Sequence, residues 1–259
     1  MATAQSTRRE LSDEELADLL VLTKKADTVE LKLTVPEAGH RSAIGGLGLD
    51  PLAAQIRQVY FFDTPDLALD RAGVVLRGRR VQQRGHDSVV KLRPAVPSEL
   101  PAELRRSPSF GVEVDAMPGG FVCSASMKGA LAPKDDVHNY LGEGRQLRKL
   151  FSKEQRAFFS THAPAGVGFE DLSILGPIFV LKLKFAPQGF DRKMVAEIWL
   201  YPDDSRILEL STKCTPAETF QVVAEAKAFL AKNGITTIGE QQAKTRKALE
   251  FFSKRLAKA

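Results

Sequence analysis

The chain has 259 residues, of which 43% are hydrophobic and 27% charged, and this composition is typical of a globular protein rather than a disordered one. Its apolar runs are far shorter than the ~18 residues that a membrane-spanning helix needs, and no apolar stretch follows the charges near the N-terminus, so we expect neither a membrane anchor nor a signal peptide. Cys123 and Cys214 lack C-x-x-C spacing and are too few for a disulfide framework, which favours a cytoplasmic protein.

The net charge of +5 arises at one end of the sequence. Residues 244–259 contain six lysines and arginines against Glu250 alone, so the rest of the chain is electrically balanced. A basic terminal helix that also carries Leu and Phe usually packs through its apolar side and leaves its charges in water. Aromatic residues do not alternate with the basic ones, as a base-stacking surface would need. Nucleic acid and membranes are therefore not expected as partners.

The first half of the chain predicts one helix followed by five strands. Ser12 and Glu15 have capping-box spacing, so we expect residues 1–25 to be a helical extension of a single domain at residues 26–259. Four prolines make residues 94–108 an irregular connection. Alternation of apolar and polar residues predicts strands at residues 27–35, 56–62, 74–80, 88–92 and 110–115.

The second half predicts helices on both sides of three further strands. Capping boxes and terminal glycine or proline residues mark where these helices begin and end. The order of elements predicts an α+β fold, in which an antiparallel sheet curls into a barrel to remove its edges and helices flank it. The expected elements are mostly helix at residues 120–160, strands within 172–186, 195–201 and 206–211, and helices at 215–232 and 238–256.

Charged residues recur two apart inside the predicted strands. Side chains on a strand alternate between two faces, so both members of each pair point the same way, while their apolar neighbours point the other way. One such pair describes any half-exposed sheet. Three purely cationic pairs on neighbouring strands would repel one another unless an anion lies between them. The pairs are Glu30/Lys32, Arg77/Arg79, Lys91/Arg93, Glu113/Asp115 and Lys182/Lys184.

These residue types suit a triphosphate or polyphosphate held together with a divalent metal ion. Arg77 and Arg79 can grip phosphate oxygens as planar forks, and Lys91 and Lys182 can act as movable point charges. A hard cation such as Mg²⁺ prefers carboxylate and phosphate oxygens. The carboxylates available on predicted strands are Glu30, Glu113, Glu197 and Glu209.

Several motifs resemble those of the CYTH family, the triphosphate tunnel metalloenzymes. The segment V-E-L-K-L at residues 29–33 resembles that family's opening strand, and Y-F-F-D-T-P at residues 60–65 resembles its turn. A-G-V-V-L-R-G-R at residues 72–79 and K-L-R at 91–93 resemble its basic strands. Glu209 resembles a residue of its late acidic strand, and residues 242–249 resemble its closing helix.

The resemblance implies an eight-stranded antiparallel tunnel whose charged lumen hydrolyses a triphosphate compound, inorganic or organic, with Mg²⁺ or Mn²⁺. By the same resemblance, Lys32 and Lys182 are the catalytic candidates. The candidates for phosphate binding are Arg77, Arg79, Lys91, Arg93 and Lys184, and those for metal binding are Glu30, Glu113, Glu197 and Glu209.

Two positions depart from the family pattern. Thr28 and Ser211 stand where further glutamates are expected, and a metal site with fewer carboxylates binds its ion more weakly. Three readings therefore stay open: a working triphosphatase, a non-catalytic module that binds triphosphate or polyphosphate, and an adenylate cyclase. The native substrate, the preferred metal and homodimer formation are also left open by the sequence.

Overall fold

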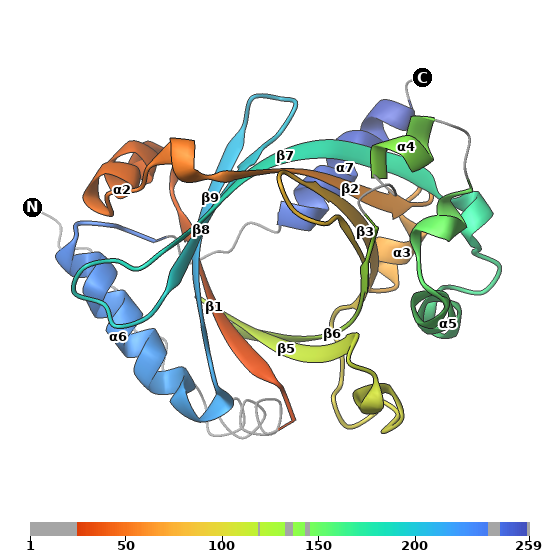
Figure 1. The fold of residues 1–259 in the computed structure, drawn as a ribbon, viewed down its shortest axis with the longest axis horizontal. Coiled ribbons are helices and arrows are strands. Elements are labelled where there is room, and N and C mark those ends of the chain that lie inside the picture. The colour runs from red at the N-terminus through yellow and green to blue at the C-terminus, as the bar shows by residue number, and fades with distance from the viewer. Residues whose placement is uncertain (1–24, 119, 133–136, 143–145, 238–243, 258–259) are drawn as a thin grey trace, which may run out of the picture.

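The computed structural model describes residues 25–118, 120–132, 137–142, 146–237 and 244–257. Within these residues the strands form one closed barrel, in the neighbour order β1-β5-β6-β4-β3-β2-β7-β8-β9 (Figure 1). Closure pairs both edges of every strand. The strands are β1 (Thr28–Val35), β2 (Gln55–Asp63), β3 (Val74–Val81), β4 (Asp87–Leu92), β5 (Phe110–Met117), β6 (Gly120–Ala130), β7 (Ser173–Phe185), β8 (Met194–Leu200) and β9 (Arg206–Cys214).

Helices flank the barrel (Figure 1). α5 packs on β4 and β6, α6 lies beside β1, and α7 packs on β7. No helix of the described residues is long and apolar enough to cross a membrane. The helices are α2 (His40–Gly46), α3 (Ala68–Arg71), α4 (Val137–Gly142), α5 (Lys153–His162), α6 (Thr219–Lys232) and α7 (Lys244–Leu256), with short 3-10 turns η1 (Glu37–Gly39), η2 (Pro51–Ala53), η3 (Leu104–Arg106), η4 (Leu147–Leu150), η5 (Phe169–Asp171) and η6 (Pro216–Glu218).

The prediction of a barrel with flanking helices is confirmed, but the predicted number of eight strands is wrong. The barrel of the described chain has nine strands, and the additional one is β6, in a region expected to be mostly helical. β6 forms a hairpin with β5 on one side and pairs with the more distant β4 on the other, and these hydrogen bonds override the weak strand preference of its Ser, Ala and Gly residues. The rest of the predicted helical region contains α4 and α5.

The barrel is also not antiparallel throughout. β1 pairs antiparallel with β9 but parallel with β5, and this second pairing places Thr28 beside Glu113 and Glu30 beside Asp115. All other neighbouring strands of the barrel are antiparallel. The parallel contact arises because β1 and β5 are far apart in sequence, so no hairpin dictates their direction. It brings carboxylates from two strands to one place.

Alternation along the strands divides the apolar side chains between two clusters. Outward-facing residues such as Leu31 and Val90 belong to the larger cluster, together with side chains of the flanking helices. The smaller cluster joins inward-facing Phe61 and Trp199 to Phe252 of α7. α7 therefore packs against the inner face of the barrel at one end, and a large apolar side chain buried there stabilises this position by about 2 kcal/mol.

The structure describes the predicted start of α5 and the predicted end of α6. The capping box before α5 is confirmed, since the Gln155 N–H donates to the Ser152 hydroxyl at 3.2 Å and the Ser152 N–H donates to the Gln155 side chain at 2.9 Å. α6 ends before Gly234, whose φ of +67° suits a helix stop. The predicted N-terminal helical extension lies outside the described residues apart from Lys25 and stays a prediction.

Asp63 in Y-F-F-D-T-P organises the turn after β2. Its side chain is buried and accepts the backbone N–H groups of Thr64 at 2.7 Å, Leu69 at 2.8 Å and Asp70 at 3.0 Å. The turn needs this support because Leu67 has a left-handed φ of 60°. The aspartate of this motif thus has a structural role, which fixes the connection between β2 and β3.

Asp63→Ala should destabilise the protein by about 3 kcal/mol, because it leaves three N–H groups without their acceptor. Asp50→Ala is the matched control, since the exposed Asp50 side chain accepts one N–H of the described residues, that of Leu52 at 2.9 Å, and its loss should cost less than about 1 kcal/mol. Chemical denaturation measures both free energies of unfolding. Equal losses for the two variants would contradict the structural role of Asp63.

Candidate functional site

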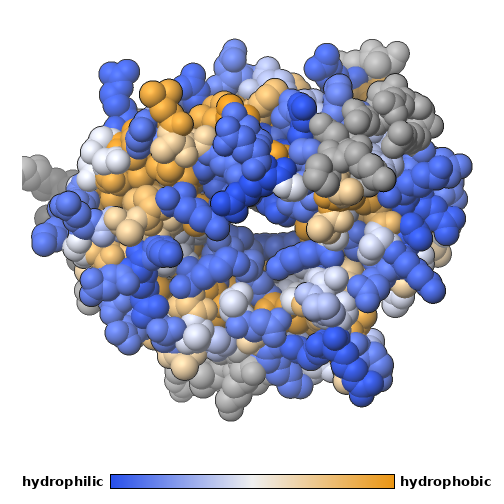
Figure 2. All heavy atoms as spheres, in the orientation of Figure 1, coloured by the Kyte–Doolittle hydropathy of each residue, from blue (hydrophilic) through white to orange (hydrophobic). Residues whose placement is uncertain are grey.

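Cross-strand register determines which side chains face the inside of the barrel. Directly opposite residues share a face, so Lys182, Glu197 and Glu209 lie together across β7, β8 and β9. Followed around the barrel, the register gathers ionic side chains on the inner surface, and Figure 2 shows a central hollow rimmed by hydrophilic residues. This inward-facing set comprises Glu30, Lys32, Arg57, Arg77, Arg79, Asp87, Lys91, Glu113, Asp115, Lys128, Lys182, Glu197, Glu209 and Lys213.

Two predicted residues, Arg93 and Lys184, lie at the margins of this set. Arg93 follows β4 and reaches the Asp115 carboxylate. Its position depends on Gly73, whose carbonyl accepts the Arg93 N–H at 2.7 Å and at which a Cβ would lie 2.6 Å from the Arg93 carbonyl. Lys184 is exposed and forms no ion pair with a residue that the structure describes, so it is not brought into the cluster.

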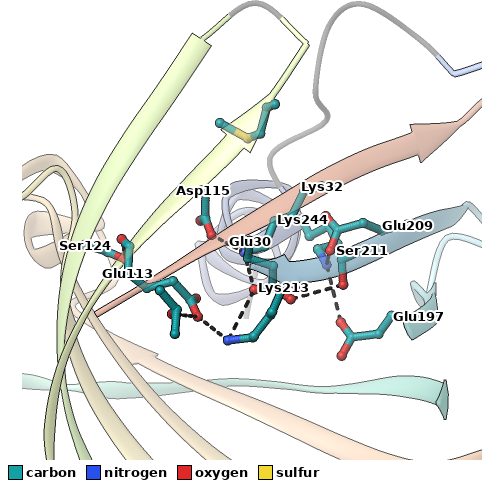
Figure 3. Close-up of polar contacts among 12 residues, drawn as sticks. Glu30, Lys32, Glu113, Asp115, Ser124, Glu197, Glu209, Ser211, Lys213 and Lys244 are labelled. Carbon is teal, nitrogen blue, oxygen red and sulfur yellow. Dashed lines mark hydrogen bonds and ion pairs between the residues drawn. The ribbon is translucent and has the colours of Figure 1, made fainter. Parts of the chain in front are cut away.

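One side of the lumen carries an acidic triad, which we define as Glu30, Glu113 and Asp115 (Figure 3). One carboxylate oxygen from each residue lies within 4.8 Å of the other two. The parallel pairing of β1 with β5 creates this proximity. Asp115 was not among the predicted metal ligands, although the sequence pairs it with Glu113. Three clustered carboxylates are a donor set that fits a hard divalent cation.

Cations of the chain already accompany the triad. Lys32 lies 2.7 Å from Asp115 and 3.5 Å from Glu30, and Lys213 pairs with Glu113. Burial opposes ionisation of Asp115, but the positive charges around it, with Lys32 foremost, lower its pKa to about 2. Burial raises the pKa of Glu30 despite the nearby Lys32. A bound divalent ion would therefore share or replace these lysine contacts.

Hydroxyl groups occupy the two positions where the sequence departs from the family pattern. The Ser211 hydroxyl donates to Glu30 at 3.0 Å, and the Thr28 hydroxyl donates to Glu113 at 3.4 Å. These residues contact the triad as hydrogen-bond donors and do not add negative charge. Acids from β5 thus supply carboxylates close to the place where β1 and β9 lack them.

The other predicted metal ligands, Glu197 and Glu209, are bound by lysines (Figure 3). Lys182 lies 2.8 Å from Glu197. Lys244 of α7 lies 2.5 Å from Glu209 and 3.4 Å from Glu197. Burial opposes ionisation of Glu197, but Lys244 and Lys182 hold its pKa well below the usual value. The sequence predicted Lys244 only as part of a basic terminal helix. The resemblance of residues 242–249 to the closing helix of the family could have indicated that Lys244 belongs to the site.

The opposite side of the lumen is cationic. Arg79 forms a two-pronged contact with Asp87 at 2.8 Å, and the Arg57 guanidinium donates to the uncharged Gln55 side chain at 2.8 and 3.1 Å. Arg57 was missed because a single arginine in an otherwise apolar strand pattern carries little signal. Burial, reinforced by Arg79, lowers the pKa of Arg57, and its side chain forms no ion pair with a described carboxylate.

The side chains of Arg77 and Lys91 form no hydrogen bond or ion pair with any residue in the described part of the chain, and the Arg77 Nε is both buried and unpartnered. Burial, reinforced by Arg79, lowers the pKa of Arg77 to about 9. Burial also lowers the pKa of Lys91 to about 8, although Asp115 partly opposes this effect. Buried cations without counter-ions are unfavourable in the free protein. They form a ready site for an anion that enters the lumen.

Comparison with known proteins identifies the fold. No protein-family model matches the sequence, and no curated protein does. A candidate adenylate cyclase from Bacillus halodurans matches with a TM-score of 0.58 and 13% identity over 85% of this chain and 96% of its own. A candidate adenylyl cyclase from Hippeastrum, described as having a dominant triphosphatase activity, matches with a TM-score of 0.62 and 15% identity over 84% and 92% of the two chains. These likenesses show that the chain shares the barrel fold of the two proteins, as the resemblance to the CYTH family predicted.

Proposed function

We propose that this protein hydrolyses a triphosphate compound inside the barrel with the help of a divalent metal ion. The observation that carries this proposal is the presence of two partly buried cations, Arg77 and Lys91, without counter-ions among the described residues. Leaving such charges uncompensated costs stability, which is reasonable where a polyanionic ligand supplies the missing charge. The acidic triad across the lumen offers a place for the metal ion that accompanies such a ligand.

Charge matching favours a triphosphate as the ligand. A triphosphate carries about four negative charges, and a divalent cation reduces this to about two. Arg57, Arg77 and Lys91 are partly buried lumen cations that form no ion pair with a described carboxylate, and their combined charge is of similar size. Arg79 and Arg93, which are bound to Asp87 and Asp115, would hold further oxygens by sharing their guanidinium donors.

The residues divide the chemical work. Arg57, Arg77 and Lys91 would bind and orient the phosphates, and Lys32 and Lys182 would neutralise charge that develops on transferring oxygens. The acidic triad would hold the metal ion, which supplies Lewis-acid stabilisation of a phosphate oxygen. The partial burial of these side chains strengthens each of these electrostatic contacts.

A non-catalytic triphosphate-binding module is the second candidate. Each acid of the triad already contacts a lysine or arginine, and Thr28 and Ser211 contribute no carboxylate. Such a site would bind the anion and hold the metal too weakly for turnover. The Hippeastrum protein is described as having a dominant triphosphatase activity, and this favours hydrolysis over binding alone and over cyclisation.

The direct test measures phosphate and pyrophosphate separately after incubation with tripolyphosphate, ATP and other triphosphates. Hydrolysis predicts phosphate release with Mg²⁺ or Mn²⁺ and none with EDTA. Pyrophosphate release from ATP would identify a cyclase instead. Tight binding of tripolyphosphate without turnover would identify the protein as a non-catalytic binding module.

Arg77→Met should lower kcat/KM for the best substrate by about 100-fold, because a fixed guanidinium donor to the phosphates is lost. Arg80→Met is the matched control, since Arg80 is exposed and lies on the outer face of the same strand. The kcat/KM of this variant should equal that of the wild type. Unchanged activity of the Arg77 variant would place phosphate binding elsewhere.

The pH dependence of binding provides a further prediction. The pKa of Lys91 lies near 8 in the free protein, below its ordinary value of 10.5, so Lys91 is charged below this pH and loses its proton above it. Affinity for tripolyphosphate should therefore fall as the pH rises through about 8, and binding above that pH should take up a proton. Calorimetric titration without metal, in buffers of different ionisation enthalpy, measures both effects.

Lys91→Met is the control for this experiment. It should bind more weakly than the wild type at neutral pH and lose the part of the pH dependence that Lys91 contributes. Tripolyphosphate gains or loses the same protons with the wild type as with Lys91→Met, so its own ionisation cancels when the two proteins are compared. Parallel pH curves for the two proteins would refute the assignment of Lys91.

A further inference from the structure

Glu197 and Glu209 create an electrostatic problem inside the barrel. They are directly opposite across β8 and β9, and their side chains are only 17% and 6% exposed. Like charges in directly opposed positions destabilise a sheet, and burial increases the cost. The two carboxylates therefore need cations nearby in order to remain ionised.

Lys244 is the cation that both carboxylates share. Its Nζ lies 2.5 Å from Glu209 Oε1 and 3.4 Å from Glu197 Oε2, and it also lies 5.0 Å from the centre of the Trp199 ring. Lys182 contacts Glu197 at 2.8 Å but has no ion pair with Glu209. Lys244 thus stands in the position, between two carboxylates, that a divalent ion would take (Figure 3).

The fold fixes Lys244 in this position. Its backbone carbonyl accepts the Tyr201 hydroxyl at 3.0 Å, and its side chain is 15% exposed. Further along α7, Leu249 and Phe252 are buried in the smaller apolar cluster. Lys213 at the acidic triad differs, since its side chain is 55% exposed and can swing into water when a metal ion binds. A metal ion can therefore displace Lys213 from Glu113 more easily than it can displace Lys244 from the Glu197–Glu209 pair.

We propose that Lys244 is a positioning residue that serves as the resident cation of the Glu197–Glu209 pair and restricts the barrel to a divalent ion at the acidic triad. A metal ion at the pair would need direct contact with the carboxylate oxygens, and the ammonium group occupies that space. Lys244 and a metal ion at the pair are therefore mutually exclusive. The expectation that the wild type binds a metal ion at the acidic triad rests on the proposed function. The expectation that removal of Lys244 allows a metal ion to bind at the Glu197–Glu209 pair does not.

The test counts Mn²⁺ ions bound per full-length chain, by electron paramagnetic resonance of free Mn²⁺ or by calorimetric titration. Lys244→Met should bind about one Mn²⁺ more than the wild type, because it leaves the carboxylate pair without its shared cation. Lys247→Met is the matched control, since Lys247 lies on the same helix, 4.7 Å from the centre of the Tyr201 ring, and its stoichiometry should equal the wild type. Adding Glu209→Gln to Lys244→Met should remove the extra ion.

A second readout does not depend on counting bound ions. The sequence contains a single tryptophan, Trp199, whose Nε1 donates to Glu197 at 3.2 Å. Paramagnetic Mn²⁺ bound at the pair would quench its fluorescence strongly, so saturating Mn²⁺ should quench Trp199 much less in the wild type than in Lys244→Met. Strong quenching in the wild type would overturn the proposal even if the variant failed to fold.

The remaining outcomes separate this proposal from the proposed function. Equal Mn²⁺ stoichiometry of the wild type and a folded Lys244→Met variant would overturn the role of Lys244. No Mn²⁺ bound by the wild type and about one by the variant would support that role, while refuting metal binding at the acidic triad.

Discussion

Charge compensation inside a closed barrel is the constraint on which the rest of this structure depends. An ionic side chain that leaves water for the lumen loses several kcal/mol of solvation unless an opposite charge replaces it. Asp115 meets this requirement through Lys32, and Glu209 meets it through Lys244. Arg77 does not meet it with any described residue. The lumen is therefore balanced on its acidic side and left open to a counter-ion on its cationic side.

Strand topology determines where the acidic and the cationic sides of the lumen lie. The parallel contact between β1 and β5 places Glu30 beside Asp115, while the antiparallel contact between β1 and β9 places Glu30 opposite Lys213. β3 and β4 lie elsewhere around the barrel and contribute Arg77 and Lys91. A shift of one residue in any of these registers would turn the ionic side chains to the outside and the apolar ones to the lumen. The apolar packing of the outer face thus also fixes the positions of the inner charges.

The sequence predicted those features that depend on local periodicity. Alternation with a period of two is a property of each strand by itself, and for this reason pairs such as Arg77/Arg79 could be placed on one face before any partner strand was known. β6 has the same alternation, with Ser124, Ser126 and Lys128 facing inward, but its small residues did not distinguish it from a helix. Two capping boxes were also readable, because each lies within four consecutive residues.

Contacts between distant segments could not be predicted in the same way. The triad needs the parallel pairing of β1 with β5, which no turn sequence specifies, so Asp115 was not recognised as part of a cluster. Arg57 is unremarkable until the register places it beside the other lumen cations. In both cases the missing information was which strands are neighbours, and this is set by the packing of the whole domain.

The C-terminal helix shows how apolar packing and lumen charge depend on each other. α7 buries Ala248, Leu249 and Phe252, as expected of a basic helix that packs through its apolar side, and it leaves Arg246 exposed beside Glu250. The expectation that its charges are all solvated is wrong for Lys244, which faces the barrel interior. The burial of apolar side chains, each worth about 2 kcal/mol, keeps the helix at the end of the barrel, and this holds one ammonium group between two carboxylates. Weaker apolar packing of α7 would therefore also release the charge that stabilises Glu197 and Glu209.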